Sequence, residues 1–437
     1  MSAPATTKYA QTTIIAVVVA NMIGTGVFTS LGFQLVDLRS GFVLLALWVI
    51  GGIVALCGAM SYAELGATMP RSGGEYNFLT RIYHPAAGFA SGWVSATIGF
   101  AAPSALAAMT FAAYATSAWP AEFDTRDEQW IAVALVIVLT LIPASSRRQS
   151  GGLQAAFTAL KVAAIVAFCI AALIAAPELQ PVSVRPQSGD AALLTSGTFA
   201  VSLIYVSYAY TGWNAATYLS SELGDPQRDL PRILFIGTAV VTVLYTALNY
   251  VFLKVAPMSA MVGQVEIGYV AARFAFGEAE ARFAGVTLAV LLISTVSAMT
   301  VAGPRVLQVI GEDFPALGIL ARTNKDQLPY VAISVQSLLT ILFIVTSTFE
   351  SVLVFAGFTL ALNSFVTVLG VFVLRWRRPE LERPFETFAY PFTPLVYLAV
   401  TGWTLAFVLN SKPVEGLAGL GVVVTGLIVY FIVSRRQ

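Results

Sequence analysis

The sequence predicts an all-α integral membrane protein. Its 437 residues are 57% hydrophobic and 11% charged, with a mean hydropathy of +0.80. An average soluble domain is about 25% charged. The apolar residues fall into twelve stretches of roughly 17 to 30 residues, and about 20 residues of helix cross the hydrocarbon core of a bilayer. We therefore expect twelve transmembrane helices and little room for a soluble domain.

The twelve predicted helices are joined by short polar connections. The first apolar run has no small-residue cleavage site before the second begins, so we expect it to remain as a helix and not to be removed as a signal peptide. We place the helices at residues 11–36, 41–66, 86–118, 129–145, 152–176, 193–219, 231–255, 282–308, 330–348, 351–374, 389–410 and 416–434.

Two predicted helices are interrupted at corresponding places. Gly24-Thr25-Gly26 interrupts the first helix, and Tyr210-Thr211-Gly212 interrupts the sixth. Each break opens a set of five spans. Since five is odd, the second set enters the membrane from the opposite side, which predicts a five-plus-five inverted repeat. The predicted parts are an N-terminal segment at 1–10, a first repeat at 11–176, a second repeat at 193–374 and two extra helices at 389–434.

The breaks predict a binding site for a zwitterion. Lipid cannot satisfy the backbone groups that a broken helix frees. Free N–H groups favour an anion and free carbonyls favour a cation. We expect the glycines to permit unusual backbone angles and close approach; the alternative is that they only let helices pack closely. The candidate substrate-binding residues are Met22, Ile23, Gly24, Thr25, Gly26, Tyr208, Ala209, Thr211 and Asn214.

These residues have expected roles. The N–H groups of residues 24–26 would hold a carboxylate, and carbonyls of both breaks would hold an ammonium group. Asn214 either lines the pocket or fixes the second break by hydrogen bonding. The arrangement predicts an amino acid as the ligand.

Lys161 lies deep in the fifth predicted helix, about nine residues or roughly 13 to 14 Å from its end. An ionisable residue at such depth is costly and by default marks a functional site. Burial lowers the pKa of a lysine, so we predict that Lys161 releases and takes up a coupling proton. The alternative is that its amine only caps backbone carbonyls of the broken first helix and never titrates.

Other chemistries lack the residues they need. The chain has two cysteines, Cys57 and Cys169, both in apolar helices, and one histidine, His84, in a connection. These cannot build a metal site, a disulfide framework or a Ser–His pair. A Gly-rich phosphate loop is also missing. The sequence therefore predicts no enzyme, no cofactor, no nucleic-acid partner and no ATPase of its own, so that any work must draw on a gradient.

The distribution of positive charge predicts the orientation. Of the 24 Lys and Arg residues, sixteen fall in the segments that a cytoplasmic N-terminus would place inside, seven fall outside, and Lys161 is the remaining one. Short cytoplasmic loops carry an excess of Lys and Arg. We therefore expect both termini in the cytoplasm of a cell with a bacterial-type inner membrane.

Several motifs occur in order along the first seven predicted helices. They are Ile23 to Phe28, Glu64 to Pro70 with Gly73, Gly74 and Tyr76, and Tyr208 to Asn214 with Glu222, Pro226, Arg228, Leu230 and Pro231. At these motifs, and at Gly303-Pro304-Arg305 in the eighth predicted helix, the sequence resembles the amino acid-polyamine-organocation superfamily, in its L-type amino acid transporter-like branch.

The resemblance implies the fold of the bacterial leucine transporter, with alternating access to a central site. It implies that Tyr208 is the aromatic gate over the substrate. Lys161 matches the fifth-helix lysine of sodium-independent members, which implies transport without sodium. Glu64 and Glu222, near the inner ends of their helices, would serve in an inner gate or a solvated pair with arginines. The arginines expected to pair with them are Arg71, Arg228 and Arg232.

The pocket helices implied by the resemblance are the first, third, sixth, eighth and tenth. Their central parts hold no Asp or Glu, and only Lys161 lies deep among the basic residues. A dibasic substrate would need a buried anion. The sequence therefore predicts a secondary active transporter of neutral L-amino acids, coupled to protons. The alternatives are an obligate exchanger and, from another class, an amino-acid-binding channel or sensor.

We expect no obligatory protein partner. A further alternative is a subunit that needs an ancillary single-span protein. The outer loops contain no cysteine, which argues only against a disulfide-linked pair.

Overall fold

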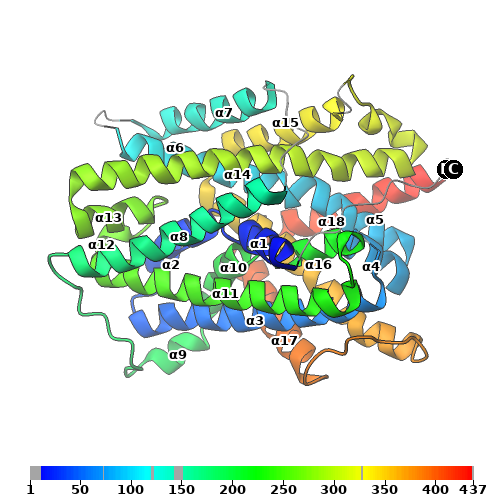
Figure 1. The fold of residues 1–437 in the computed structure, drawn as a ribbon, viewed down its shortest axis with the longest axis horizontal. Coiled ribbons are helices and arrows are strands. Elements are labelled where there is room, and N and C mark those ends of the chain that lie inside the picture. The colour runs from blue at the N-terminus through cyan, green and yellow to red at the C-terminus, as the bar shows by residue number, and fades with distance from the viewer. Residues whose placement is uncertain (1–10, 72, 120–122, 142–150, 326–327, 436–437) are drawn as a thin grey trace.

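The structure is a computed structural model that describes residues 11–71, 73–119, 123–141, 151–325 and 328–435, without the side chains of 151–158 and 219–222. The described residues form helices and connections and no β-strand. Figure 1 shows the long helices running side by side along the long axis of the molecule, with α1 and α10 near its centre. Among these described residues, eight helical stretches are long and apolar enough to cross a bilayer. The chain is a multi-pass membrane protein.

Uninterrupted helices build most of the bundle. They are α3 (Gly41–Thr68), α7 (Thr125–Leu141), α8 (Gly151–Ala175), α11 (Pro226–Val255), α14 (Glu278–Asp313), α15 (Tyr330–Thr346), α16 (Phe349–Arg377), α17 (Phe392–Ser411) and α18 (Pro413–Ser434). Each overlaps a predicted helix; residues 142–145 of the fourth predicted helix and the predicted N-terminal segment at 1–10 lie outside the described residues. The difference is largest for α14, which has 36 residues because its polar ends continue the helix beyond the apolar stretch that hydropathy detects.

Three predicted helices are interrupted, including the two whose breaks the sequence predicts. Residues 23–25 separate the first two elements, and Tyr210 to Gly212 form a turn in the sixth predicted helix. The third predicted helix is also interrupted, by a π-helical segment that we did not expect. The pieces are α1 (Gln11–Met22) and α2 (Gly26–Asp37), then α5 (Pro85–Val94), η1 (Ser95–Gly99) and α6 (Ala101–Ser117), then α10 (Gly197–Ala209) and η2 (Trp213–Glu222).

Five short helices lie in connections that the sequence analysis left without secondary structure. They are too short or too polar to register as apolar spans. They are α4 (Gly74–Ile82), α9 (Asp190–Leu194), α12 (Met258–Met261), α13 (Ile267–Phe276) and η3 (Pro315–Ala321).

The two ends of α3 define the two ends of the bundle. Gly41 packs against Val182 in the connection before α9, and we call this side the Gly41 end. α3 finishes near the loop that follows α16, and we call this side the Thr68 end. The start of α1 lies at the Thr68 end, because Gln11 donates a hydrogen bond of 2.6 Å to Asp229 at the start of α11.

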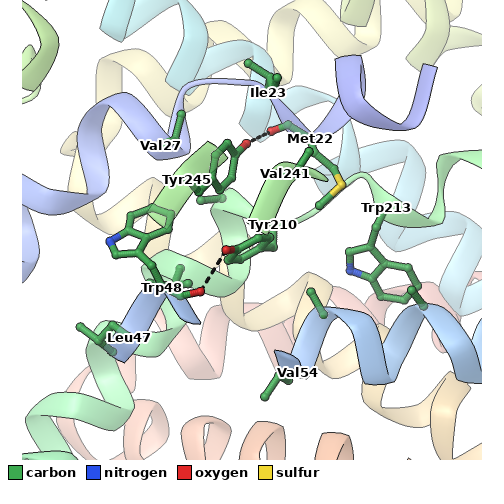
Figure 2. Packing of buried hydrophobic residues seen from close by; sticks show 14 of the residues in the cluster. Met22, Ile23, Val27, Leu47, Trp48, Val54, Tyr210, Trp213, Val241 and Tyr245 are labelled. Atoms are coloured by element: carbon green, nitrogen blue, oxygen red, sulfur yellow. Dashed lines mark hydrogen bonds between the residues drawn. The ribbon is translucent and has the colours of Figure 1, made fainter. Parts of the chain in front are cut away.

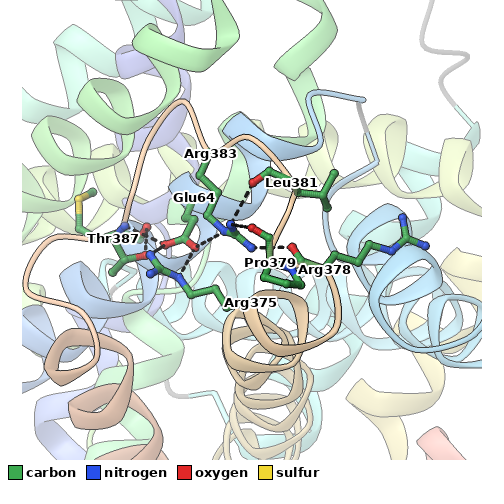
Figure 3. A network of polar contacts seen from close by, with 8 residues as sticks. Glu64, Arg375, Arg378, Pro379, Leu381, Arg383 and Thr387 are labelled. Atoms are coloured by element: carbon green, nitrogen blue, oxygen red, sulfur yellow. Dashed lines mark hydrogen bonds and ion pairs between the residues drawn. The ribbon is translucent and has the colours of Figure 1, made fainter.

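A buried carboxylate fastens the Thr68 end. Glu64 is 1% exposed, and the Arg375 guanidinium donates two hydrogen bonds of 2.8 Å to its two oxygens. The Thr387 backbone N–H donates a third at 2.8 Å, and Arg383 lies 3.8 Å away. Figure 3 shows how this network joins α3 and α16 to the loop between α16 and α17.

The predicted partners of Glu64 are wrong. Glu64 pairs with Arg375 and Arg383, which lie more than 300 residues along the chain, because the loop after α16 folds back onto α3. Arg228 instead lies 3.8 Å from Asp225. For Glu222, the other carboxylate in this prediction, the structure gives the end of η2 but the side chain lies outside the described part. The gate roles of both residues stay predictions.

We expect Glu64→Gln to lower the unfolding temperature of the purified protein in detergent. Removing one partner of a buried ion pair leaves the other charge uncompensated; because the Arg375 side chain is 20% exposed, we expect a loss of about 2 kcal/mol in the free energy of unfolding. Arg378→Gln, which removes an exposed charge from the same loop, should leave the unfolding temperature unchanged. Equal unfolding temperatures for Glu64→Gln and the wild type would contradict a stabilising role for the network.

Candidate functional site

The two helix breaks lie against each other in the centre of the bundle. A Cβ atom on Gly26 would lie 2.6 Å from the Cα of Ala209, and a Cβ on Gly212 would lie 2.7 Å from the carbonyl oxygen of Asn21. Gly212 also has φ +101°, a conformation that favours glycine. The expectation of a special role for glycine therefore holds at 26 and 212. It is wrong at Gly24, where a Cβ would have room and φ is not positive.

Side chains from α3, α10 and α11 hold the breaks in place. The Tyr245 hydroxyl donates a hydrogen bond to the Met22 carbonyl, where α1 ends. The Tyr210 hydroxyl donates to the Trp48 carbonyl at 2.9 Å. Figure 2 shows these two bonds within a cluster of buried aromatic rings. Since Trp48, Tyr210 and Tyr245 are all fully or almost fully buried, the backbone of both breaks is fixed by packing as well as by hydrogen bonds.

Some backbone groups at the breaks are already used. The Met22 carbonyl accepts hydrogen bonds from Tyr245 and from the Gly24 N–H. The Tyr208 carbonyl accepts from the N–H and the hydroxyl of Thr211. A carbonyl has two lone pairs. These two carbonyls therefore have no remaining capacity for an ammonium group in this conformation.

Other groups at the breaks are free. Within the described chain, the N–H groups of Thr25 and Gly26 have no hydrogen-bond partner, as is normal for the first residues of a helix. The carbonyls of Ile23 and Ala209 likewise accept no hydrogen bond from described residues. The breaks thus offer two donors at the start of α2 and an acceptor from each helix, which suits a carboxylate and an ammonium group.

A cavity of about 330 Å³ lies between the breaks. This is within the range of about 300 to 1,000 Å³ that is usual for small-molecule sites. All the predicted substrate-binding residues line it. They are Met22, Ile23, Gly24, Thr25, Gly26, Tyr208, Ala209, Thr211 and Asn214.

The cavity's other walls come from the third, eighth and tenth predicted helices, as the resemblance implies, and from α4, which it does not. The π-helical segment η1 contributes Ser95, and α14 and α16 contribute residues from the second half of the chain. The additional lining residues that carry polar or bulky side chains include Asn21, Glu75, Phe100, Thr295, Met299, Asn363 and Ser364. We call this space the central cavity.

Glu75 is the most important of the missed residues. It is 2% exposed and belongs to α4, outside every predicted helix. Its carboxylate accepts hydrogen bonds from the Tyr62 hydroxyl at 3.1 Å, from the Asn214 amide at 2.5 Å and from the Tyr218 hydroxyl. The signal was present in the sequence, because the residue follows Gly73 and Gly74 in a motif that the analysis singled out. Both glycines adopt positive φ and turn Glu75 inward.

The contact with Glu75 also explains Asn214. Its side chain lines the central cavity and donates to a carboxylate from another helix. The two expected roles of this residue, lining the pocket and fixing the break, are therefore combined in one side chain.

Tyr208 lies at the end of α10 and lines the central cavity. It is 5% exposed and packs in an apolar cluster with Ile204, Leu106 and Phe349. Phe349 begins α16 at the Gly41 end. Tyr208 thus lies between the cavity and the packed residues that lead to that end.

Lys161 lies on the other side of the first break. It lines a second cavity of about 190 Å³, and this cavity shares Ile23, Gly24 and Thr295 with the central one. Within the described chain, the Lys161 amine donates one hydrogen bond, to the Thr295 hydroxyl at 3.4 Å, and forms no ion pair. The expected capping of first-helix carbonyls is not the contact that this conformation shows.

The described residues contain no group of three or more His, Cys, Asp or Glu side chains that could hold a metal ion. The two cysteines are unpaired. The site is therefore built from backbone groups, hydroxyls, amides and two ionisable residues, Lys161 and Glu75.

Comparison with known proteins gives a consistent result. The chain is 30% identical over 431 residues to "Large neutral amino acids transporter small subunit 2" of Mus musculus, covering 95% of this chain and 79% of the relative. It is 28% identical over 428 residues to "Asc-type amino acid transporter 1" of the same organism, covering 95% and 79%. It is 27% identical over 430 residues to the murine "b(0,+)-type amino acid transporter 1", covering 96% and 86%.

These relatives confirm the resemblance to L-type amino acid transporters and exclude an enzyme. The sequence model described as "Amino acid permease" matches residues 10–433, nearly the whole chain. The protein therefore belongs to the amino acid permease family.

Proposed function

We propose that the protein is a sodium-independent secondary active transporter of neutral L-amino acids and that the central cavity binds the substrate. One observation carries this proposal. Among the described residues, the N–H groups of Thr25 and Gly26 and the carbonyls of Ile23 and Ala209 have no hydrogen-bond partner, and all four residues line the central cavity. The substrate carboxylate binds the donors and its ammonium group binds the acceptors, while the side chain extends toward the apolar wall.

The same contacts support an inverted repeat of twelve spans. The start of α2 meets the end of α10 at Gly26 and Ala209, and the end of α1 meets the start of η2 at Asn21 and Gly212. This reciprocity is what a two-fold axis through the site would produce. We propose repeats at 11–176 and 193–374, with the helices of 389–434 added to them.

We propose that both termini are cytoplasmic, in the cell's inner membrane. The excess of Lys and Arg in the corresponding loops supports this orientation. The start of α1 and the end of α18 also lie on one side, because Gln11 binds Asp229 while Tyr430 packs beside His84 near the start of α5.

Neutral substrates fit the charges of the cavity. Glu75 supplies an anion that the sequence analysis did not expect, but three donors already bind its oxygens. Only one of its lone-pair positions, on Oε2, then remains for a dibasic side chain. The name of the first relative, a transporter of large neutral amino acids, supports the same substrate class.

Coupling to protons is the part of the proposal that rests on Lys161. Lys161 lines an apolar cavity beside the first break, and among the described residues its amine has one long hydrogen bond, so few groups stabilise its positive charge. Ile23 and Gly24 line both cavities, so a proton released from Lys161 at one stage of the cycle would change the charge beside the first break. The alternative is obligate exchange of amino acids, with Lys161 as a fixed cation.

A protein partner is a second question. One relative is named a small subunit, which implies a larger one for that protein. This name speaks against our expectation of no obligatory partner. Cys57 and Cys169, the only cysteines of this chain, lie in α3 and α8. We therefore propose only that a protein partner, if this chain has one, binds without a disulfide. A partner that co-purifies under non-reducing conditions and separates on reduction would overturn this.

Tyr208 tests the proposed gate. Tyr208→Phe keeps the ring, so we expect KM within about fivefold of the wild type, since losing one hydrogen bond costs about 1 kcal/mol. Tyr208→Ala removes the ring, and truncating a buried aromatic side chain costs about 3 to 5 kcal/mol. We expect KM to rise at least about tenfold in that variant. If alanine and phenylalanine gave the same KM, the ring would not be the lid.

Uptake into sodium-free proteoliposomes tests the function. A mixture of labelled neutral amino acids is supplied with an inside-alkaline pH gradient or without one, to empty and to amino-acid-loaded vesicles, with labelled lysine as a comparison. Gradient-dependent accumulation of a neutral amino acid in empty vesicles is the expected result. Uptake into loaded vesicles alone would establish exchange, and binding without uptake would indicate a sensor.

A further inference from the structure

Glu75 is the carboxylate that joins the second half of the broken sixth helix to the rest of the bundle. Its oxygens accept from Asn214 and Tyr218, both in η2, and from Tyr62 in α3. Glu75 itself belongs to α4. Three separate elements thus meet at one buried side chain, and two of the three donors come from the segment that follows a helix break.

The position of this cluster relates it to the central cavity. Glu75, Asn214 and Tyr218 all line the cavity, and η2 runs from the second break toward the Thr68 end. The cavity reaches the same end along α1, where Val17 and Ala20 line it. The position of η2 therefore determines how wide the cavity is on this side.

The backbone at Gly212 separates η2 from α10, the first half of the same predicted helix. Gly212 breaks the hydrogen-bonding pattern between α10 and η2, so η2 can move without α10. η2 is a 3₁₀ segment, a form usual in short pieces and at hinges. On its other side, Gly74 packs against the Tyr218 ring, with a would-be Cβ 2.9 Å from it. The hydrogen bonds to Glu75 thus add to the packing of Trp213 and Ala216 in holding η2 in place.

The charge of Glu75 suits this role. Within the described chain it has no cationic partner, so its negative charge is stabilised by donors alone. A hydrogen bond to a charged group is stronger than one between neutral groups. Because two donors lie on η2, most of that stabilisation is lost when η2 moves away.

We propose that Glu75 is a positioning residue that latches η2 onto α3 and α4 and so limits the opening of the central cavity at the Thr68 end. This inference rests on the proposed function, because a latch has a purpose only if the cavity opens. A substrate that enters or leaves at this end requires the bonds from Asn214 and Tyr218 to break and to form again in each cycle.

A cysteine on η2 reports the opening. Ala215 lines the cavity and takes no part in the latch. Ala215→Cys is introduced into a chain with Cys57→Ser and Cys169→Ser, and the rate of labelling by a bulky charged maleimide is measured in detergent. Adding Glu75→Gln or Tyr218→Phe should raise this rate about tenfold, since hydrogen bonds to charged groups shift an equilibrium by about that factor.

Tyr205→Phe is the matched control. Tyr205 lies on α10, on the other side of the same break, and its hydroxyl donates a bond of 2.8 Å to the carboxylate of Glu350. Removing that hydroxyl should leave labelling of Ala215→Cys unchanged. The comparison keeps the chemistry of the substitution constant and changes only which side of the break loses its bond.

Two results would overturn the inference. One is an unchanged labelling rate in both Glu75→Gln and Tyr218→Phe, even with a lowered unfolding temperature, since Glu75 would then be purely structural. The other is an equal rise in the Tyr205→Phe control. Tyr218→Phe keeps the test decisive if Glu75→Gln fails to fold. Labelling does not depend on transport. The labelling result therefore tests the role of Glu75, while the uptake assay separately tests the proposed function.

Discussion

Gly212→Ala is expected to abolish amino acid uptake. The residue combines φ +101° with a would-be Cβ only 2.7 Å from the backbone oxygen of Asn21. Alanine at a strained backbone position costs about 1 to 3 kcal/mol, and here the neighbouring backbone must also move. A total near 3 kcal/mol corresponds to about a 100-fold loss of the native break geometry. The measurement is initial uptake per folded protein in proteoliposomes.

Substitutions at three other glycines distinguish the effect of backbone strain from the effect of the Cβ clash. Gly189→Ala introduces only backbone strain, since φ is +96° and no atom lies within 4 Å of the new Cβ. Gly26→Ala introduces only the clash with Ala209, and Gly24→Ala introduces neither. We expect uptake to fall strongly for Gly26→Ala and to stay near the wild type for Gly189→Ala, with Gly24→Ala folded normally. Full uptake by Gly212→Ala would mean that the contact between the breaks is dispensable.

Lys161→Met is expected to stop accumulation driven by a pH gradient. Methionine matches much of the lysine stem but cannot carry a proton, and Lys161 is the one charged residue in the sequence from 151 to 175. If Lys161 couples transport to protons, gradient-driven accumulation should fall at least about tenfold, as for other intramembrane ionisable groups at functional sites. Exchange into amino-acid-loaded vesicles should continue, because it needs no net proton movement.

Lys254→Met serves as the control for this substitution. That lysine lies in the last turn of α11 and donates to the carbonyls of Gln180 and Val182 at 3.3 Å, away from both cavities. Its loss should leave accumulation unchanged. Wild-type accumulation by Lys161→Met would remove Lys161 from the coupling mechanism, and loss of exchange together with accumulation would give it a structural role.

The helix breaks could be predicted because their cause is local. Gly24-Thr25-Gly26 and Tyr210-Thr211-Gly212 place glycines inside long apolar runs, and such interruptions are visible in one sequence. That the breaks meet also followed from their spacing and number of spans. The π-helical segment Ser95–Gly99 could not be found this way, since its composition resembles that of the helices beside it.

Pairs of residues that are far apart along the chain could not be predicted from the sequence. Arg375 reaches Glu64 because a loop of the second half folds back, and no local pattern indicates that pairing. Glu75 was missed for a different reason. Carboxylates were expected only inside the pocket helices, but this one enters the cavity from a short helix in a connection. Its sequence signal is a charged residue directly after two glycines, which turn the chain at that point.

Determining the structure of the protein with its substrate is the most direct test of the central claim. The neutral amino acid taken up fastest in proteoliposomes is added to the purified protein, and its position is read from a cryo-electron microscopy map. The account predicts density for one amino acid in the central cavity, with the carboxylate at the N–H groups of Thr25 and Gly26 and the ammonium group at the carbonyls of Ile23 and Ala209. Density in the cavity beside Lys161, with the central cavity empty, would contradict it.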